Sequence, residues 1–204
     1  DKRWKERARN TAVLVDGTSY STYDKHVLVP FGEFLPGRDL IPTLKDLIPG
    51  VSDLYEGSGP TIMRVRDVKV GMSICYEALF SMFMWRNNAD SDLLINLTDD
   101  VWFGPTNAPE LHLMVQLPRA VELRRPLLRA TATGVSALVD ATGRIHGRTP
   151  VWKATSRVVN VEMRDLDSPF RLWGPWPSWL LALGVLGAVG WCWREERGQQ
   201  TANS

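Results

Sequence analysis

The sequence predicts a layered α/β domain followed by one membrane-spanning helix. Short apolar runs of strand length alternate with two stretches of helical character between residues 11 and 161. A nearly continuous apolar segment follows at residues 177–193. The chain has 204 residues, of which 44% are hydrophobic and 23% charged, so it is long enough to bury one core.

The first expected element is a β-hairpin. Residues 11–15 (TAVLV) favour a strand, residues 16–19 (DGTS) supply a turn, and a second strand returns toward Lys25. Three residues that interrupt regular structure come next, namely Pro30, Gly32 and Pro36. Glu33 is therefore expected on a loop.

The remaining elements alternate between strands and helices. Strands are expected at residues 61–66, 68–74, 93–97, 127–132, 135–139 and 155–161. One helix is expected at about 77–85, and a second at 111–124 with a bend at Pro118. Residues 140–143 (DATG) supply a further hairpin turn.

The apolar tail has the composition of a membrane span. Residues 177–193 (PSWLLALGVLGAVGWCW) number 17, which is the short end of the required length, and no charged side chain occurs from Leu172 to Trp193. Tryptophans suited to the membrane interface lie near both ends: Trp173, Trp176, Trp179 and Trp191. The alternative is a terminal helix buried in a soluble core.

Charges beyond the tail predict its orientation. Arg194 and Arg197 follow the span, and the two glutamates between them count for little in the positive-inside rule. We therefore expect a cytoplasmic tail at 194–204, a transmembrane helix at 171–193 and an outward-facing domain at 1–170.

Composition argues against several classes of partner and site. The formal net charge is +1, which gives no electrostatic case for nucleic acid binding. The two cysteines lie in different contexts, Cys75 after a strand-like run and Cys192 in the apolar tail, so we expect no disulfide between them. With three histidines and no CxxC pair, no metal site and no cofactor are expected.

Cys75 is the candidate nucleophile. It ends the apolar run of GMSICYE (71–77), and a turn after a strand can expose a cysteine sulfur to a cleft. A neighbouring ammonium such as that of Lys25 would favour the reactive thiolate. The plainer interpretation is that Cys75 is a small buried apolar residue, as most lone cysteines are.

Four long motifs carry a family resemblance. They are YDKHVLVPFGEFLP (23–36), GMSICYE (71–77), INLTDDVWFG (95–104) and RAVELRRPLLRATATGVSALVDATGRI (119–145). Together they resemble the catalytic domain of the apolipoprotein N-acyltransferases, a membrane-bound branch of the nitrilase superfamily. The resemblance implies a four-layer αββα sandwich, here incomplete at its N-terminus.

The resemblance also implies roles for individual residues. Cys75 would be the nucleophile, and Lys25 the cation beside the tetrahedral intermediate. Glu33, eight positions after Lys25, would orient it or assist proton transfer. Tyr76 and Glu77 would shape the pocket, with the backbone N–H of residue 76 helping to hold the oxyanion; Glu77 would otherwise serve only the dipole of the next helix.

Other motif residues would support the site. By the resemblance these are Asn96, Asp99, Asp100, Trp102 and His112. No catalytic histidine is required by the nitrilase pattern, so a Cys–His pair with His112 is not expected. In the family, loops near residues 37–60 help to admit lipid, which makes candidates of Leu47, Ile48, Val51, Leu54 and Tyr55. A satellite core cluster would explain those five equally well.

The chain departs from the family pattern in its general base. The family's first catalytic glutamate precedes the lysine by more than the 24 residues available here. Glu6 is the only glutamate before Lys25, and because it lies in a charged run we leave the base unassigned. The N-terminal residues also lack the apolar segment of a signal peptide. We therefore expect the C-terminal part of a longer protein, inactive on its own.

The expected function is acyl transfer at the bacterial inner membrane. By the resemblance, Cys75 would take a fatty acyl chain from a phospholipid donor and pass it to the N-terminal cysteine of an apolipoprotein, with the domain periplasmic and the protein monomeric. One rival is an amidase that hydrolyses small amides, but it does not explain the apolar tail. Another is a membrane-tethered binding domain whose cysteine is structural.

Overall fold

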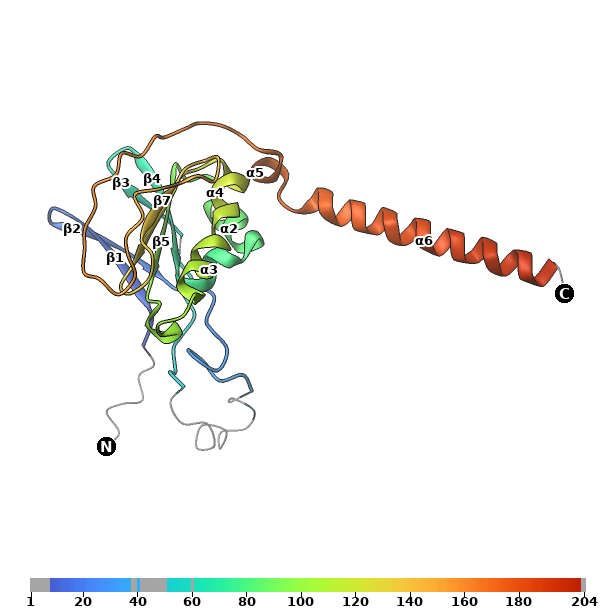
Figure 1. Cartoon of the computed structure of the whole chain (residues 1–204), viewed down its shortest axis with the longest axis horizontal. Coiled ribbons are helices and arrows are strands. Elements are labelled where there is room, and N and C mark those ends of the chain that lie inside the picture. Colours follow the sequence, from blue (N-terminus) through green and yellow to red (C-terminus); the bar gives the residue numbers. More distant parts are fainter. Residues whose placement is uncertain (1–7, 38–39, 41–50, 60, 203–204) are drawn as a thin grey trace.

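The fold combines a six-stranded sheet, a two-stranded sheet, a layer of short helices and a long C-terminal helix (Figure 1). The computed structural model describes residues 8–37, 40, 51–59 and 61–202, with only the backbone for 195–202. Its mixed α/β architecture confirms the predicted fold class. The described residues supply three layers, helix, sheet and sheet, of the four in an αββα sandwich.

The predicted hairpin is present. Strands β1 (Thr11–Asp16) and β2 (Ser19–Asp24) pair antiparallel, from Thr11 opposite Asp24 to Asp16 opposite Ser19. Gly17 in the two-residue turn has a φ of +60°, a conformation that glycine adopts without steric cost. The hairpin places Lys25 directly after β2.

The larger sheet has the strand order β3-β4-β5-β6-β7-β8. Its strands are β3 (Ile62–Val65), β4 (Val68–Ile74), β5 (Leu93–Thr98), β6 (Leu127–Thr131), β7 (Ala137–Val139) and β8 (Ile145–His146). The central strands β4, β5 and β6 are parallel, and the outer strands pair antiparallel. Because the three central strands run the same way, their carboxyl ends meet at one edge of the sheet.

Each face of the large sheet buries a separate core. Crossover helices α2 (Ser81–Asn88), α3 (Ala108–Met114) and α4 (Leu117–Leu123) cover one face, as parallel strands require (Figure 1). Their core includes Met84, Leu113 and Leu123, packed with the buried strand residues Leu94 and Leu127. The β1–β2 hairpin lies on the opposite face, where its Ala12 and Tyr23 pack with Met63, Met72 and Ile74.

Two predicted helices differ in detail from the structure. The helix expected at 77–85 is a 3-10 helix, η2 (Cys75–Leu79), followed by α2, because Phe80 adopts an extended backbone. The helix expected at 111–124 is two helices, α3 and α4. Pro118 lies in the first turn of α4, where backbone N–H groups have no partner within the helix, so the N–H that proline lacks is not needed there.

The strand predicted at 155–161 is wrong. These residues have no regular structure, and Val158 is 99% exposed. Thr and Val favour a strand only where a neighbouring strand offers hydrogen bonds and a surface to pack against. This segment instead passes over Gly147, where Val159 would be 2.5 Å from an added Cβ.

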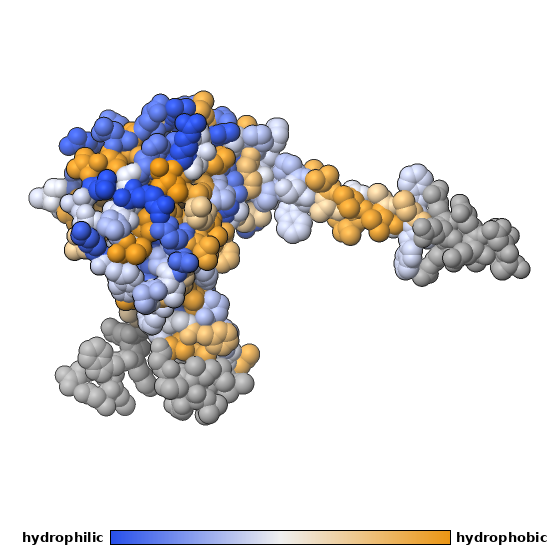
Figure 2. All heavy atoms as spheres, in the orientation of Figure 1, coloured by the Kyte–Doolittle hydropathy of each residue, from blue (hydrophilic) through white to orange (hydrophobic). Residues whose placement is uncertain are grey.

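The C-terminal helix α6 (Trp176–Ala202) extends away from the domain (Figure 1). Residues Trp176–Arg194 are long and apolar enough to cross a membrane, and none of that window is buried in the protein. Figure 2 shows its apolar surface well separated from the domain. A helix packed in the core of the described domain would be buried, and this window is not.

A short helix, α5 (Pro169–Trp173), attaches the chain to the domain just before α6. Trp85 Nε1 donates to Arg171 O at 2.9 Å, and Arg171 Nε donates to Ala89 O at 2.7 Å. The buried guanidinium of Arg125 binds the preceding segment through the carbonyls of Arg164 and Leu166, at 2.8 and 2.9 Å. The connector is therefore held against α2 and α4 by specific hydrogen bonds.

Gly174 is expected to be essential for the docking of α5. Its φ is +62°, and an added Cβ would lie 2.5 Å from the indole of Trp85. We expect Gly174→Ala to weaken docking by at least about 1–2 kcal/mol, the cost of the left-handed conformation alone. Hydrogen exchange of the amides at 168–174 should accelerate about tenfold, whereas Gly184→Ala, in open space on α6, should leave it unchanged. Unaltered exchange in Gly174→Ala would contradict this account.

Candidate active site

Cys75 stands at a sharp turn from strand to helix. It directly follows β4, begins η2, and has a φ of +56°. A non-glycine residue in this region costs about 1 kcal/mol and is found where the surrounding structure enforces it. Such a turn presents a nucleophile beyond the end of the sheet. The thiol residue is half-buried rather than sealed in the core.

Glu77 is a buried carboxylate that joins this turn to the segment after β2. Its Oε1 accepts from the backbone N–H groups of His26 and Val27, at 2.7 and 2.8 Å. Its Oε2 accepts from Tyr23 Oη at 2.7 Å and from the N–H of Ile74 at 2.6 Å. The side chain thus does more than face a helix dipole, because it draws residues 23–27 against the Cys75 turn.

The phenol of Tyr23 is a donor in this arrangement. Burial, and then the negative charge of Glu77 and its hydrogen bond, raise the pKa of Tyr23 far above its ordinary value. Tyr23 therefore stays protonated, and its hydroxyl donates a hydrogen bond to Glu77.

Lys25 is buried and held by Glu33. Its Nζ lies 2.8 and 2.7 Å from the two carboxylate oxygens of Glu33, and the residue is 1% exposed. Glu33 Oε2 also accepts from the N–H of Val29 at 2.9 Å, which fixes the carboxylate on its loop. Lys25 Nζ lies 5.3 Å from the ring centroid of Tyr76, the residue after Cys75. Lys25 is therefore not an ordinary solvent-exposed lysine.

Tyr76 positions a loop rather than exchanging a proton. Its Oη donates to the carbonyl of Leu28 at 2.6 Å, and its ring meets Phe80 edge-on at 5.1 Å. Burial, and then the charges of Glu33, Glu77 and Cys75, raise the pKa of Tyr76. The phenol stays neutral and keeps residues 25–28 close to the turn.

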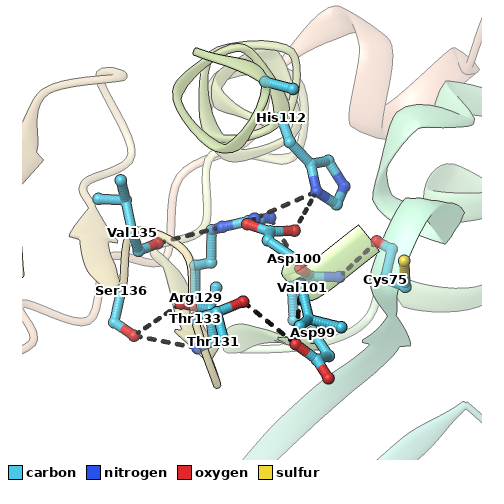
Figure 3. Close-up of polar contacts among 12 residues, drawn as sticks. Cys75, Asp99, Asp100, Val101, His112, Arg129, Thr131, Thr133, Val135 and Ser136 are labelled. Atoms are coloured by element: carbon cyan, nitrogen blue, oxygen red, sulfur yellow. Dashed lines mark hydrogen bonds and ion pairs between the residues drawn. The ribbon is translucent and has the colours of Figure 1, made fainter. Parts of the chain in front are cut away.

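A second buried cluster lies behind Cys75 (Figure 3). Asn96 Nδ2 donates to the carbonyl of Cys75 at 3.0 Å, and its Oδ1 accepts from Arg129 at 3.3 Å. Arg129 also donates to Asp100 Oδ2 at 2.7 Å, and Asp100 Oδ1 lies 2.8 Å from His112 Nδ1. These residues form a continuous polar connection from α3 to the nucleophile turn.

Asp100 is kept ionised within this cluster. Burial raises its pKa, but the hydrogen bond with His112 and the charge of Arg129 outweigh burial and lower the pKa below its ordinary value of 3.8. An added Cβ at Gly134 would lie 1.9 Å from Asp100 Oδ2, so only glycine fits there. His112 is thus a partner of Asp100.

Two of the expected supporting residues lie on the loop after β5. Asp99 Oδ1 accepts from the N–H of Val101 at 3.0 Å and from Thr133 Oγ1 at 3.2 Å. Trp102, on the 3-10 helix η3 (Val101–Phe103), is 88% exposed. Asp99 therefore shapes this loop, whereas the indole of Trp102 faces outward.

The proposed lipid-admitting loop is described in part. Val51 and Leu54 are half-buried and Tyr55 is 47% exposed, while Leu47, Ile48 and Glu6 lie outside the described residues. The N–H of Leu54 donates to the carbonyl of Glu33 at 2.9 Å. The loop therefore supports the backbone of the residue that holds Lys25.

The structure brings all five predicted site residues into one region, and it adds Arg129. Arg129 lies inside the motif at residues 119–145. The sequence feature that could have identified it is a single charged residue within a strand that is otherwise largely apolar. Within the described part of the chain, no group of three or more His, Cys, Asp or Glu side chains is placed to hold a metal. The geometry suits covalent chemistry at a thiol whose next residue, Tyr76, lies beside a fixed ammonium.

Comparison with known proteins agrees with this geometry. The model of the carbon-nitrogen hydrolase family matches residues 2–168. A curated protein of Bdellovibrio bacteriovorus named apolipoprotein N-acyltransferase is 38% identical over 201 residues, covering 93% of this chain and 36% of its own length. A protein of the same name from Geobacter metallireducens is 32% identical over 179 residues, covering 86% of this chain and 34% of its own length. The chain thus spans about a third of these relatives.

A solved structure shows the same fold. Glutamine-dependent NAD+ synthetase from Acinetobacter baumannii superposes with a TM-score of 0.54 at 16% identity, over 72% of this chain and 27% of that protein. At this identity the similarity concerns the fold alone.

Proposed function

The chain belongs to the carbon-nitrogen hydrolase family, and from that membership we propose that it carries the nucleophile of a lipoprotein N-acyltransferase. The names of the curated relatives support this reaction class. The observation that carries the proposal is the buried Lys25 ammonium, fixed by Glu33 beside the residue that follows Cys75.

The proposed reaction has two half-reactions. The Cys75 thiolate attacks the ester carbonyl of a phospholipid acyl chain, a thioester forms, and the lysophospholipid leaves with a proton. The amino group of a lipoprotein's N-terminal cysteine then attacks the thioester, loses a proton, and releases the thiolate as the amide forms. Lys25 and the N–H of Tyr76 stabilise the oxyanion in both steps.

The general base is not assigned to a residue of this chain. Glu77 accepts four hydrogen bonds and Glu33 is paired with Lys25, so both carboxylates already have partners. We propose that the base is a glutamate outside these 204 residues and that Glu33 orients Lys25. The 204 residues alone are therefore expected to be inactive.

We also propose that α6 anchors the domain at the periplasmic face of the inner membrane. Its apolar window supports this placement, and Arg194 and Arg197 support a cytoplasmic end. The phospholipid donor would then be reached from the outer leaflet by a monomer.

Mass spectrometry of the full reading frame that encodes this chain, incubated with phospholipid vesicles, tests the proposal. An acyl adduct is expected on Cys75, lost in Cys75→Ala and kept in Cys192→Ser, which removes the other cysteine. The isolated 204 residues should show no turnover. An adduct that survives Cys75→Ala would refute the assignment, and ammonia release from small amides without an adduct would instead indicate an amidase.

A further inference from the structure

We propose that Asn96 is a positioning residue that orients the oxyanion-binding N–H of Tyr76. This inference rests on the proposed function and extends it to a residue in the middle of β5. Asn96 is fully buried, and its Nδ2 donates to the backbone carbonyl of Cys75 at 3.0 Å.

One peptide group joins Cys75 to Tyr76 and links the two atoms concerned. The carbonyl of Cys75 and the N–H of Tyr76 belong to the same planar group, and in a trans peptide they point in opposite directions. No cis peptide occurs in the described chain. A hydrogen bond that fixes this carbonyl therefore also fixes the direction of the N–H, away from Asn96.

The peptide needs such a restraint because Cys75 is strained. Its φ of +56° is a conformation that a cysteine leaves readily unless contacts hold it. Glu77 holds the turn from one side through the N–H of Ile74. Asn96 holds it from the other side through the carbonyl of Cys75.

Strand register places Asn96 for this task. Ser73 on β4 lies opposite Asn96 on β5, and Asn96 lies opposite Arg129 on β6. Asn96 Nδ2 also lies 3.1 Å from Ser73 Oγ, and its Oδ1 accepts from Arg129. Because a guanidinium only donates, Arg129 turns the amide oxygen toward itself and leaves the NH2 group for the carbonyl of Cys75.

Arg129 is itself immobilised. Its side chain is fully buried, its Nε donates to the carbonyl of Val135 at 3.2 Å, and it pairs with Asp100 at 2.7 Å. The bonds therefore run from Asp100 through Arg129 and Asn96 to Cys75. The hydrogen bonds of Arg129 reach the nucleophile turn through Asn96, and its positive charge also acts on Cys75.

The decisive variant is Asn96→Asp in the full reading frame. Aspartate has nearly the same shape and accepts from Arg129, but it cannot donate to the carbonyl of Cys75. We expect the rate of Cys75 acylation by phospholipid to fall about 10- to 100-fold, with an unchanged KM, because the oxyanion donor is misdirected. If Asn96 served only as a partner for Arg129, Asn96→Asp would retain the wild-type rate, and that result would overturn the proposal.

A double-mutant cycle tests the order of the bonds. Arg129→Gln should slow acylation in the wild type and have a smaller effect in Asn96→Ala, because its hydrogen-bonded route to Cys75 is already broken and only the effect of its charge on Cys75 remains. Arg125→Gln is the matched control, since Arg125 is equally buried but binds the α5 connector. Its effect should add to that of Asn96→Ala. Additive effects of Arg129→Gln and Asn96→Ala would overturn the proposed order.

Hydrogen exchange separates this inference from the acyl-transfer proposal. The Tyr76 amide should exchange faster in Asn96→Asp than in the wild type, whether or not the enzyme acylates Cys75. If the wild type forms no acyl adduct, the proposed function is contradicted but the positioning role of Asn96 is not. Unchanged exchange at Tyr76 would sink the positioning role of Asn96 alone.

Discussion

Replacing Glu77 by alanine is expected to lower the free energy of unfolding by about 4 kcal/mol or more, because four donors lose their acceptor at once. Each unsatisfied buried donor costs about 1–3 kcal/mol. Urea unfolding, followed by circular dichroism in detergent, measures the change. Acyl transfer should be lost as well, because the segment that carries Lys25 is no longer held against the Cys75 turn.

Two further variants make the Glu77 prediction specific. Tyr23→Phe removes one of the four donors and should cost only about 1–2 kcal/mol. Glu110→Ala removes a glutamate whose ion pair with Arg148 is exposed, and it should change stability by less than about 1 kcal/mol. Equal costs for Glu77→Ala and Glu110→Ala would show that Glu77 does not hold the site together.

Replacing Asp100 by alanine is expected to cost about 3–5 kcal/mol at neutral pH, because the buried charge of Arg129 loses its partner. The cost should depend on pH. Since the folded-state pKa of Asp100 is lowered, the stability that it contributes is present above pH 3.8 and is lost as the pH falls through the folded value. The difference between wild type and Asp100→Ala should therefore shrink as the solution is acidified below about pH 3.8.

Urea titrations at pH 7 and about pH 3 test this dependence. Arg129 and His112 are the charged or titratable groups that contact Asp100, and both remain in the variant. Asp165→Ala is the control, because Asp165 is 98% exposed although it pairs with the buried Arg125. A difference between wild type and Asp100→Ala that is the same at both pH values would contradict the assigned charge.

Local signals predicted the parts of the fold that depend on neighbouring residues. The DGTS turn predicted the hairpin, and the apolar run before Cys75 predicted β4 and the turn that follows. The resemblance identified Lys25 and Glu33, and the structure pairs them at hydrogen-bond distance. Their catalytic roles stay predictions.

Long-range partners could not be predicted in the same way. Glu77 binds groups about 50 positions earlier, and no periodicity in the sequence encodes that distance. Arg129 meets Asn96 only because β5 and β6 pair in one register. The strand expected at 155–161 failed for the same reason, since its Val and Thr residues have no adjacent strand.

The docked connector has a mechanical consequence. A domain tied to its anchor by a flexible linker would rotate freely and sample many heights above the lipid. Here Gly174 packs under Trp85, and Pro175, with its restricted backbone, leads directly into α6. Under the proposed anchorage by α6, we expect this short connection to limit rotation of the domain and to keep the Cys75 turn within a narrow range of heights above the lipid.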